Sequence, residues 1–273
     1  MRIPITDDHI HIDPRNGRGL EAAKEFQRTG GTHLMLVSKP SWSFGVVPHD
    51  PADFELVFTE TLSVAASLRD LGLKVFPVLG VHPAEITRLC EYLPLAEARD
   101  LMIGALSRAA VHVQEGRAIA LKSGRPHYPV GDEILRASNE VLSHALSLGK
   151  ECACAVQVHA ESGPCEDIIE MARRAGISPA RVVKHYAVPE TPLIPSFIAT
   201  HEAIPALCRE KRRFTMESDY MDENSRPGAV IGPRSVPRIT LRLLEKGLIT
   251  EEDAIRIHVT TPEEVYGVEI ALP

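Results

Sequence analysis

Short apolar segments alternate regularly with segments of helical periodicity along this chain, and few folds accommodate that order. Continuous apolar runs are typical of parallel strands covered on their outer face, and strand–helix alternation indicates an α/β fold. The expected strands are residues 2–8, 32–38, 74–80, 117–122, 152–159, 181–185, 194–200 and 213–219. The expected helices are residues 19–29, 54–71, 83–115 with Pro94 as a breaking point, 132–149, 163–175, 203–211, 234–246 and 251–258.

Eight strands in 273 residues predict a single (β/α)8 TIM-barrel domain spanning residues 1–273, because such barrels form one domain of roughly 250 residues. The alternative is an open, doubly wound sheet. The first strand is not followed by the GxGxxG pattern of dinucleotide-binding folds, which weakens the usual form of that alternative.

Composition narrows the class of protein. The formal charge of −7 argues against a broad nucleic-acid surface, since phosphate binding is driven mainly by Lys and Arg. The five cysteines include no CxxC pair, and we expect reduced thiols in a cytoplasmic protein. The N-terminal segment lacks a signal pattern, and no apolar run is long enough to span a membrane, so we expect no membrane association. Oligomeric state cannot be read from the sequence.

The chain has twelve histidines, and several of them lie where strands are expected to end. In a (β/α)8 barrel the carboxyl ends of the strands form the active site. His9 and His11 follow the first strand, and residues two apart on a strand point the same way, so both rings can hold one metal. By itself such an HxH pair is as well explained by ordinary polar residues at a strand end.

Lys122 ends the fourth expected strand. A lysine inside a barrel is costly unless its charge is paired or removed. It can form a salt bridge, or it can react with carbon dioxide to give a carbamate. The carbamate is anionic and its oxygens can bridge two metals.

Three further strands end in a potential ligand. His159 ends the fifth, His185 the sixth and Asp219 the eighth. A single histidine of this kind is more often a core residue, but two on adjacent strands favour a metal site. Asp219 can bind metal and accept a proton from an attacking water, or it can cap a turn. Glu217 faces the same way and is a lesser candidate.

Over nearly the whole chain, the sequence resembles the TatD-related metal-dependent hydrolases of the amidohydrolase superfamily. DDHIHID resembles the opening D-x-H-x-H of that family, and GVHPAEI its GxHP segment. VQVHAES, VVKHYAV and FTMESDY resemble its later His, His and Asp blocks, and TPEEVYGV its closing NPxxLFG. The segment IALKSGRPHYPV departs from the family, because Lys122 stands where TatD-like proteins have a bridging Glu. Phosphotriesterase-like enzymes have a carboxylated lysine at that place.

The resemblance implies two divalent metals. His9, His11 and Asp219 would hold one, His159 and His185 the other, and carboxylated Lys122 would bridge them. Zinc is the first expectation, with Mn, Fe, Co or Ni as alternatives. Water activated by the metals would attack a carbonyl carbon or phosphorus, and Asp219 would take its proton.

Other residues are candidates for the substrate side of the pocket. His82 and Arg125 are predicted to bind substrate, and His127 is a weaker candidate that surface exposure explains as well. Trp42, the only tryptophan, lies in the long loop of residues 39–53 and could cover the mouth or simply pack there. Asp7 and Asp8 precede the HxH pair and are expected to support it.

Three functions are compatible with the sequence. The first is hydrolysis of a small-molecule ester, lactone, amide or phosphoester. The second is a metal-dependent deoxyribonuclease, as TatD relatives suggest; a nucleic-acid partner is therefore possible but not favoured. The third is a non-catalytic barrel whose metal site is damaged by an unmodified Lys122. The substrate itself cannot be read from the sequence.

Overall fold

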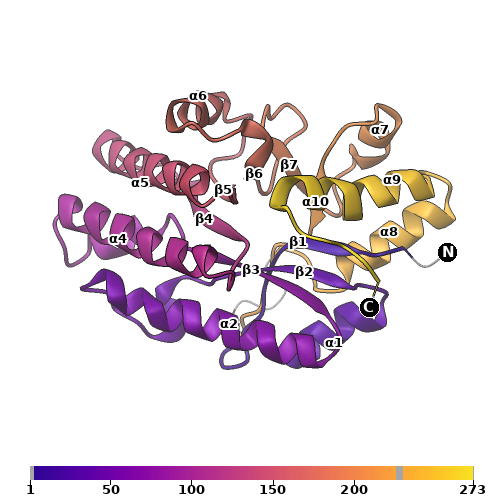
Figure 1. Cartoon of the computed structure of the whole chain (residues 1–273), viewed down its shortest axis with the longest axis horizontal. Coiled ribbons are helices and arrows are strands. Elements are labelled where there is room, and N and C mark those ends of the chain that lie inside the picture. The colour runs from indigo at the N-terminus through magenta and orange to yellow at the C-terminus, as the bar shows by residue number, and fades with distance from the viewer. Residues whose placement is uncertain (1–2, 226–229, 273) are drawn as a thin grey trace.

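The computed structural model describes residues 3–225 and 230–272. Parallel strands curl into a barrel, and helices cover its outer face (Figure 1). This confirms the α/β barrel predicted from the alternation. The strands are β1 Thr6–His11, β2 His33–Val37, β3 Lys74–Gly80, β4 Ala120–Gly124, β5 Ala155–His159, β6 Val182–Lys184, β7 Ile194–Ile198, β8 Thr215–Glu217 and β9 Tyr220–Met221.

The eighth strand of the barrel is broken into two pieces, β8 and β9. The strand order is β8-β7-β6-β5-β4-β3-β2-β1-β9. β8 pairs with β7 and β9 pairs with β1, so hydrogen bonding runs around the ring. Between the two pieces, the Asp219 amide donates to the His9 carbonyl at 2.9 Å. This closure excludes the open doubly wound sheet.

The helices follow the strands in chain order. They are α1 Leu20–Arg28, α2 Glu55–Asp70, α3 Glu85–Leu89, α4 Leu95–Gln114, α5 Asp132–Glu151, α6 Glu166–Ala175, α7 Ile204–Arg209, α8 Ser235–Glu245, α9 Glu251–Ile255 and α10 Thr261–Tyr266. Short helical turns η1 Ser41–Phe44, η2 Pro51–Phe54, η3 Pro179–Arg181 and η4 Arg256–Thr260 connect them.

The largest apolar core lies between the sheet and α2 to α6. Small residues on α4 and α5, among them Ala105, Ala109 and Ala145, are fully buried there and let the helices approach the strands closely. Because burial of apolar area is the main stabilising term of a fold, this layer holds the strand ends in fixed positions. No helix in the described parts of the chain is long and apolar enough to cross a membrane. All five cysteines are free thiols.

Several element boundaries differ from those expected. β1 lies further along the chain than residues 2–8, because Ile10 and His11 pair with β9 and so belong to the sheet; Arg2 lies outside the described residues. The helix expected at 83–115 is two helices, and Pro94 caps the second in an extended conformation. β4 continues past Lys122 to Gly124, which places Lys122 inside the barrel.

Candidate metal centre

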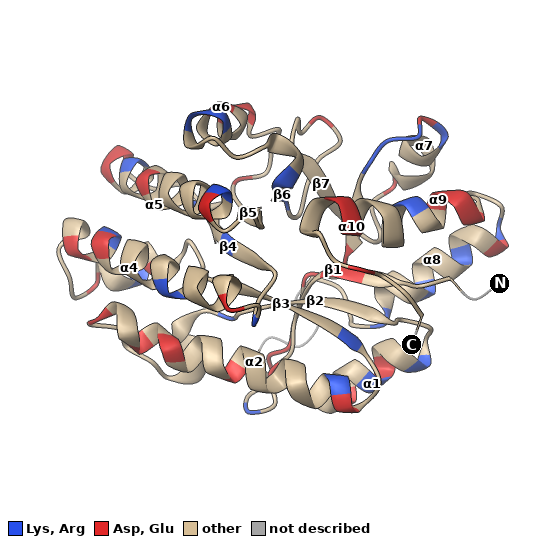
Figure 2. Ribbon diagram, in the orientation of Figure 1, with Lys and Arg blue, Asp and Glu red and all other residues tan. Residues whose placement is uncertain are grey.

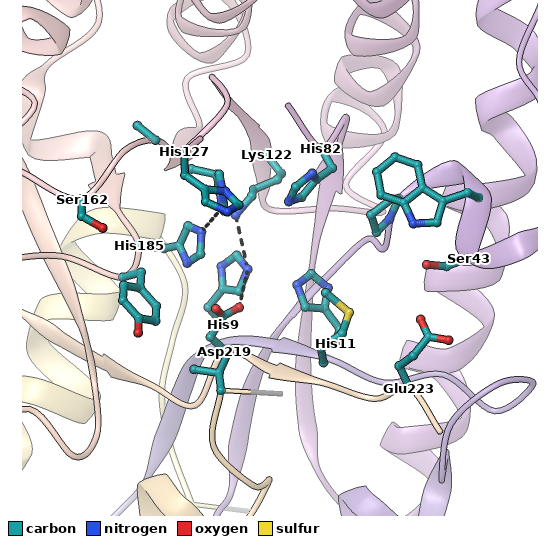
Figure 3. Close-up of a pocket in the computed structure, with 17 residues that line it drawn as sticks. His9, His11, Ser43, His82, Lys122, His127, Ser162, His185, Asp219 and Glu223 are labelled. Atoms are coloured by element: carbon teal, nitrogen blue, oxygen red, sulfur yellow. Dashed lines mark hydrogen bonds and ion pairs between the residues drawn. The ribbon is translucent and has the colours of Figure 1, made fainter. Parts of the chain in front are cut away.

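A cavity of about 420 Å³ opens at the carboxyl ends of the strands, where (β/α)8 barrels place their active sites. Figure 3 shows imidazole rings from different strands directed toward one another in it. Seven of the predicted site residues line this cavity: His9, His11, His82, Lys122, His159, His185 and Asp219. The remaining one, Arg125, is not among its described lining residues.

The two β1 histidines are both oriented by acceptors from other strands. His11 Nδ1 lies 2.9 Å from the Val37 carbonyl, which can only accept, so this nitrogen carries the proton. His9 Nδ1 lies 2.8 Å from Gln157 Oε1. The Gln157 amide group donates to the Asp8 carbonyl at 2.7 Å, which fixes its orientation and makes His9 Nδ1 the donor. Nε2 of each ring therefore carries no proton and presents its lone pair.

His159, which ends β5, and His185, which directly follows β6, form a second pair. His159 Nδ1 lies 2.7 Å from His185 Nε2. His185 Nδ1 is 3.2 Å from Glu217 Oε1, and His159 Nε2 is 2.7 Å from His127 Nδ1. His159 is thus anchored through Nε2 and His185 through Nδ1, and the remaining nitrogens of the two rings face each other. Metal-bound histidines are oriented in this way by a partner of the second ring nitrogen.

Asp219 lies where the eighth strand breaks. Its φ of +45° is unusual for a residue with a side chain and separates β8 from β9. Its carboxylate Oδ1 is 3.8 Å from His9 Nε2, and burial raises its pKa to about 6. The ligand atoms of His9, His11 and Asp219 all lie within 4.8 Å of one another.

Lys122 is fully enclosed at the floor of the cavity, where 2% of its surface is exposed. Its Nζ lies 3.3 Å from His9 Nε2, as the dashed line in Figure 3 marks. Burial lowers the pKa of this amine to about 7, although Asp219 and Glu217 oppose the shift. A large fraction of the amine is therefore neutral and nucleophilic near neutral pH.

The histidines around Lys122 are kept neutral. Burial lowers the pKa of His9, His159 and His185 well below the usual value, and of His11 to about 3. Neutral imidazole is the form that binds metal. Four neutral imidazoles, a carboxylate and a lysine on one cavity make a donor set of the kind that zinc and similar divalent metals use. The residues present therefore fit a metal centre.

The residues predicted to bind substrate, to cover the mouth or to support the ligands differ in whether they reach the cavity. Arg125 is 5% exposed and donates to the carboxylates of Glu161 and Asp167, which occupies its guanidinium. Trp42 and His82 both line the cavity, with their rings edge to face at 6.2 Å. Asp7 supports the centre as expected, because its Oδ1 accepts from the backbone amides of His9 and Ser218.

Sequence reasoning missed two residues that orient the centre, Gln157 and Tyr186. Gln157 is fully buried in β5, two residues before His159. A lone amide inside an apolar strand was the available signal. Glu217, ranked as a lesser ligand, accepts from His185 and from the Tyr186 amide, and the ligand atoms of Glu217, His9 and His185 all lie within 4.8 Å of one another, so it stays a candidate ligand. His127 is exposed as expected, yet it anchors His159.

The family model of TatD-related DNases matches residues 6–267. An uncharacterised protein of Methanocaldococcus jannaschii is 36% identical over 99% of this chain and 98% of its own length.

Solved structures share the fold at low identity. A TatD homologue from Escherichia coli K12 superposes with a TM-score of 0.66, at 16% identity and 98% coverage of both chains. The phosphotriesterase homology protein of Escherichia coli, complexed with phosphate in its active site, gives 0.61 at 12% identity, covering 97% of this chain and 99% of the other. A lactonase from Listeria monocytogenes gives 0.61 at 14% identity, covering 97% and 95%.

Proposed function

The chain belongs to the TatD-related DNase family, and from this premise we propose that it is a binuclear metal-dependent hydrolase of small molecules. The observation that carries the proposal is the orientation of four histidines. Each has one nitrogen anchored by a neighbour, and all four rings line a cavity that also holds Asp219 and Lys122. The remaining nitrogens of His159 and His185 lie 2.7 Å apart, where one metal could take both. A structural histidine cluster has no need of this arrangement.

The proposed ligands form two groups. His9, His11 and Asp219 hold one metal, and His159 and His185 hold the second. Lys122 stands on β4, between the strands that carry these groups, and its Nζ already contacts His9. An anionic group at this position would compensate the charge of two cations, whereas an ammonium would repel them.

We infer that Lys122 becomes a carbamate. The neutral amine attacks the carbon of carbon dioxide, a nitrogen–carbon bond forms, and the nitrogen loses a proton to solvent. The low pKa of the buried amine supplies the neutral form that this step needs. The product has the charge and the two oxygens of the glutamate that TatD-like proteins carry at this place.

The chain's own residues would then have distinct tasks. When bound, the metals would supply Lewis acidity, which lowers the pKa of a water and stabilises negative charge on the substrate. Asp219 accepts the proton of the attacking water, and the burial that raises its pKa to about 6 suits it to exchange that proton near neutrality. His82, which lines the cavity, donates a hydrogen bond to the substrate.

The substrate bond is an ester, lactone, amide or phosphoester. The second candidate, a deoxyribonuclease, is favoured by the family match alone. Lys122 is the only Lys or Arg among the described residues that line the cavity, and Glu223 adds a carboxylate. Figure 2 shows both charge signs on outer helices such as α1, α4 and α5. A strand of DNA would need a more basic surface than this.

The decisive experiment measures metal content and hydrolysis in wild type, Lys122→Glu and Lys122→Met. Each protein is prepared with zinc, with and without bicarbonate. We expect wild type to hold about two metals only with bicarbonate, Lys122→Glu to hold two in both preparations, and Lys122→Met to hold at most one. Loaded wild type is then assayed on esters, lactones, amides, phosphoesters and single-stranded DNA.

Three results would overturn the proposal. Two metals in Lys122→Met would remove the bridging role of Lys122. No metal in wild type under any condition would favour the non-catalytic reading of the barrel. Cleavage of DNA with no turnover of small substrates would assign the chain to the second candidate.

A further inference from the structure

The mouth of the cavity carries two exposed aromatic side chains, Trp42 and Tyr186. Trp42 is 38% exposed and Tyr186 is 50% exposed, and both line the cavity. A single exposed aromatic residue is common, but two that line the same cavity are typical of a site that binds an apolar group. Trp42 follows β2 and Tyr186 follows β6, which are four strands apart in the ring of eight. They therefore stand on opposite walls.

Trp42 is held in place by a buried carboxylate. The turn that carries it, η1, begins at Ser41, whose amide donates to Glu85 Oε1 at 2.6 Å and whose hydroxyl donates to Glu85 Oε2 at 2.9 Å. Glu85 is 1% exposed. Burying a carboxylate is costly, and here it anchors the turn that carries the exposed Trp42.

Tyr186 is held in the same manner on the other wall. Its amide donates to Glu217 Oε1 at 2.8 Å, and Glu217 is fully buried. Its φ is +50°, a left-handed conformation that tyrosine rarely adopts. Strain of this kind persists where the surroundings impose it, and it is typical of functional sites.

We infer that Trp42 and Tyr186 form an aromatic clamp that binds an apolar, preferably aromatic, arm of an uncharged ester substrate. This rests on the proposed hydrolase function and names its substrate class. The arm lies between the two aromatic walls while the scissile bond reaches the histidine floor. Pro40 and Met221 extend the apolar lining, and the carboxylate of Glu223, which also lines the cavity, disfavours an anionic arm.

The first test uses three methyl esters with the same leaving group and the zinc- and bicarbonate-loaded enzyme. They are methyl propanoate, methyl 3-phenylpropanoate and monomethyl succinate, which differ in a hydrogen, phenyl or carboxylate on the acyl chain. We expect kcat/KM for the phenyl ester to exceed that of the other two by about tenfold or more. Trp42→Ala and Tyr186→Asn each bring the phenyl-to-hydrogen ratio close to one.

Tyr186→Asn is chosen because asparagine tolerates a positive φ and keeps the amide that Glu217 binds. The control is Leu248→Ser, since Leu248 is 44% exposed and is not among the described lining residues of the cavity. This variant keeps the wild-type ratio. An equal rate on all three esters, a preference for monomethyl succinate, or a Tyr186→Asn protein with the wild-type ratio would overturn the clamp.

A second test needs no turnover, because Trp42 is the only tryptophan of the chain and its fluorescence reports on the mouth. The probes are three ketones that carry a carbonyl but no scissile bond: butan-2-one, 4-phenylbutan-2-one and levulinate. The phenyl ketone should cause a saturable change at the lowest concentration, and Tyr186→Asn should raise its Kd at least fivefold. If no ester is cleaved while this binding holds, the proposed function fails and the clamp stands. If esters are cleaved and the three ketones bind alike, the clamp fails alone.

Discussion

At the scale of single residues, the centre depends on which nitrogen each histidine directs at the cavity. His9, His11 and His185 are anchored through Nδ1, whereas His159 is anchored through Nε2 by His127. A ring can face a metal with either nitrogen, so its anchor decides which one is available. His127 is a positioning residue in this sense, because it touches His159 and no reacting atom is assigned to it.

His127→Phe should therefore lower the affinity of the second metal by about ten- to a hundredfold, because His159 loses the partner that orients it. His127→Asn retains an acceptor near the position of Nδ1 and should restore most of the affinity. The measurement is metal content after dialysis against a graded series of weak chelators, with the exposed His49→Phe as control. Equal metal content in His127→Phe and wild type would contradict the role.

At the scale of elements, the centre requires β4 and β5 to lie in close register. Gly124 pairs with His159, and a Cβ on Gly124 would lie 1.8 Å from the His159 carbonyl oxygen. Its φ is +155°. A glycine is therefore needed where the strand bearing Lys122 ends beside the strand bearing His159. The sequence showed Gly124 only as a residue after Lys122, because close approach of two backbones is a property of the sheet.

Gly124→Ala should lower the free energy of unfolding by at least about 2 kcal/mol, because the backbones of β4 and β5 must separate to admit the methyl group. It should also weaken metal binding, since both strands carry proposed ligands. Gly131→Ala is the matched control, because a Cβ there meets nothing within 4 Å. Urea unfolding of both variants gives the comparison. A Gly124→Ala protein as stable as Gly131→Ala would show that the strands can move apart freely.

At the scale of the whole molecule, a buried histidine that is not among the described residues lining the cavity joins segments far apart in the chain. His258, in η4, donates from Nδ1 to the Thr6 carbonyl at 3.1 Å and accepts at Nε2 from Thr240 at 2.8 Å. It thereby joins β1, the C-terminal helices and α8. Burial lowers its pKa to about 4, so the folded barrel keeps this ring neutral.

The sign of the pH effect follows from this shift. In the unfolded chain His258 is protonated below about pH 6.5, whereas in the folded chain it stays neutral down to about pH 4. The free energy of unfolding therefore falls as the pH falls through this window. The contribution lost between pH 7.5 and pH 5 is about 2 kcal/mol. His258→Asn lacks this titrating ring, so its free energy of unfolding should fall by about 2 kcal/mol less than that of wild type over this interval. Urea unfolding of both proteins without metal measures the difference. An identical loss in both proteins would contradict the assignment.

Much of the centre was predictable because parallel strands bring their carboxyl ends to one rim of a barrel. Strand–helix alternation fixed the order of the strands, and a period of two placed His9 and His11 on one side. His159, His185 and Asp219 followed from the same rule, and all of them line the cavity. Their roles as metal ligands stay predictions until metal is measured.

The remaining features depend on contacts between residues that are far apart in the chain. His9 and Gln157 are 148 residues apart, and His127 and His159 are 32 apart. Arg125 follows Lys122 directly, yet Glu161 and Asp167 take its guanidinium. The barrel and the donors at its rim follow from local periodicity, because periodicity sets the strands and the faces of their side chains. The orientation of the histidine rings, the ion pairs of Arg125 and the two aromatic walls depend on hydrogen bonds and packing between strands, and these contacts exist only once the ring of strands has closed.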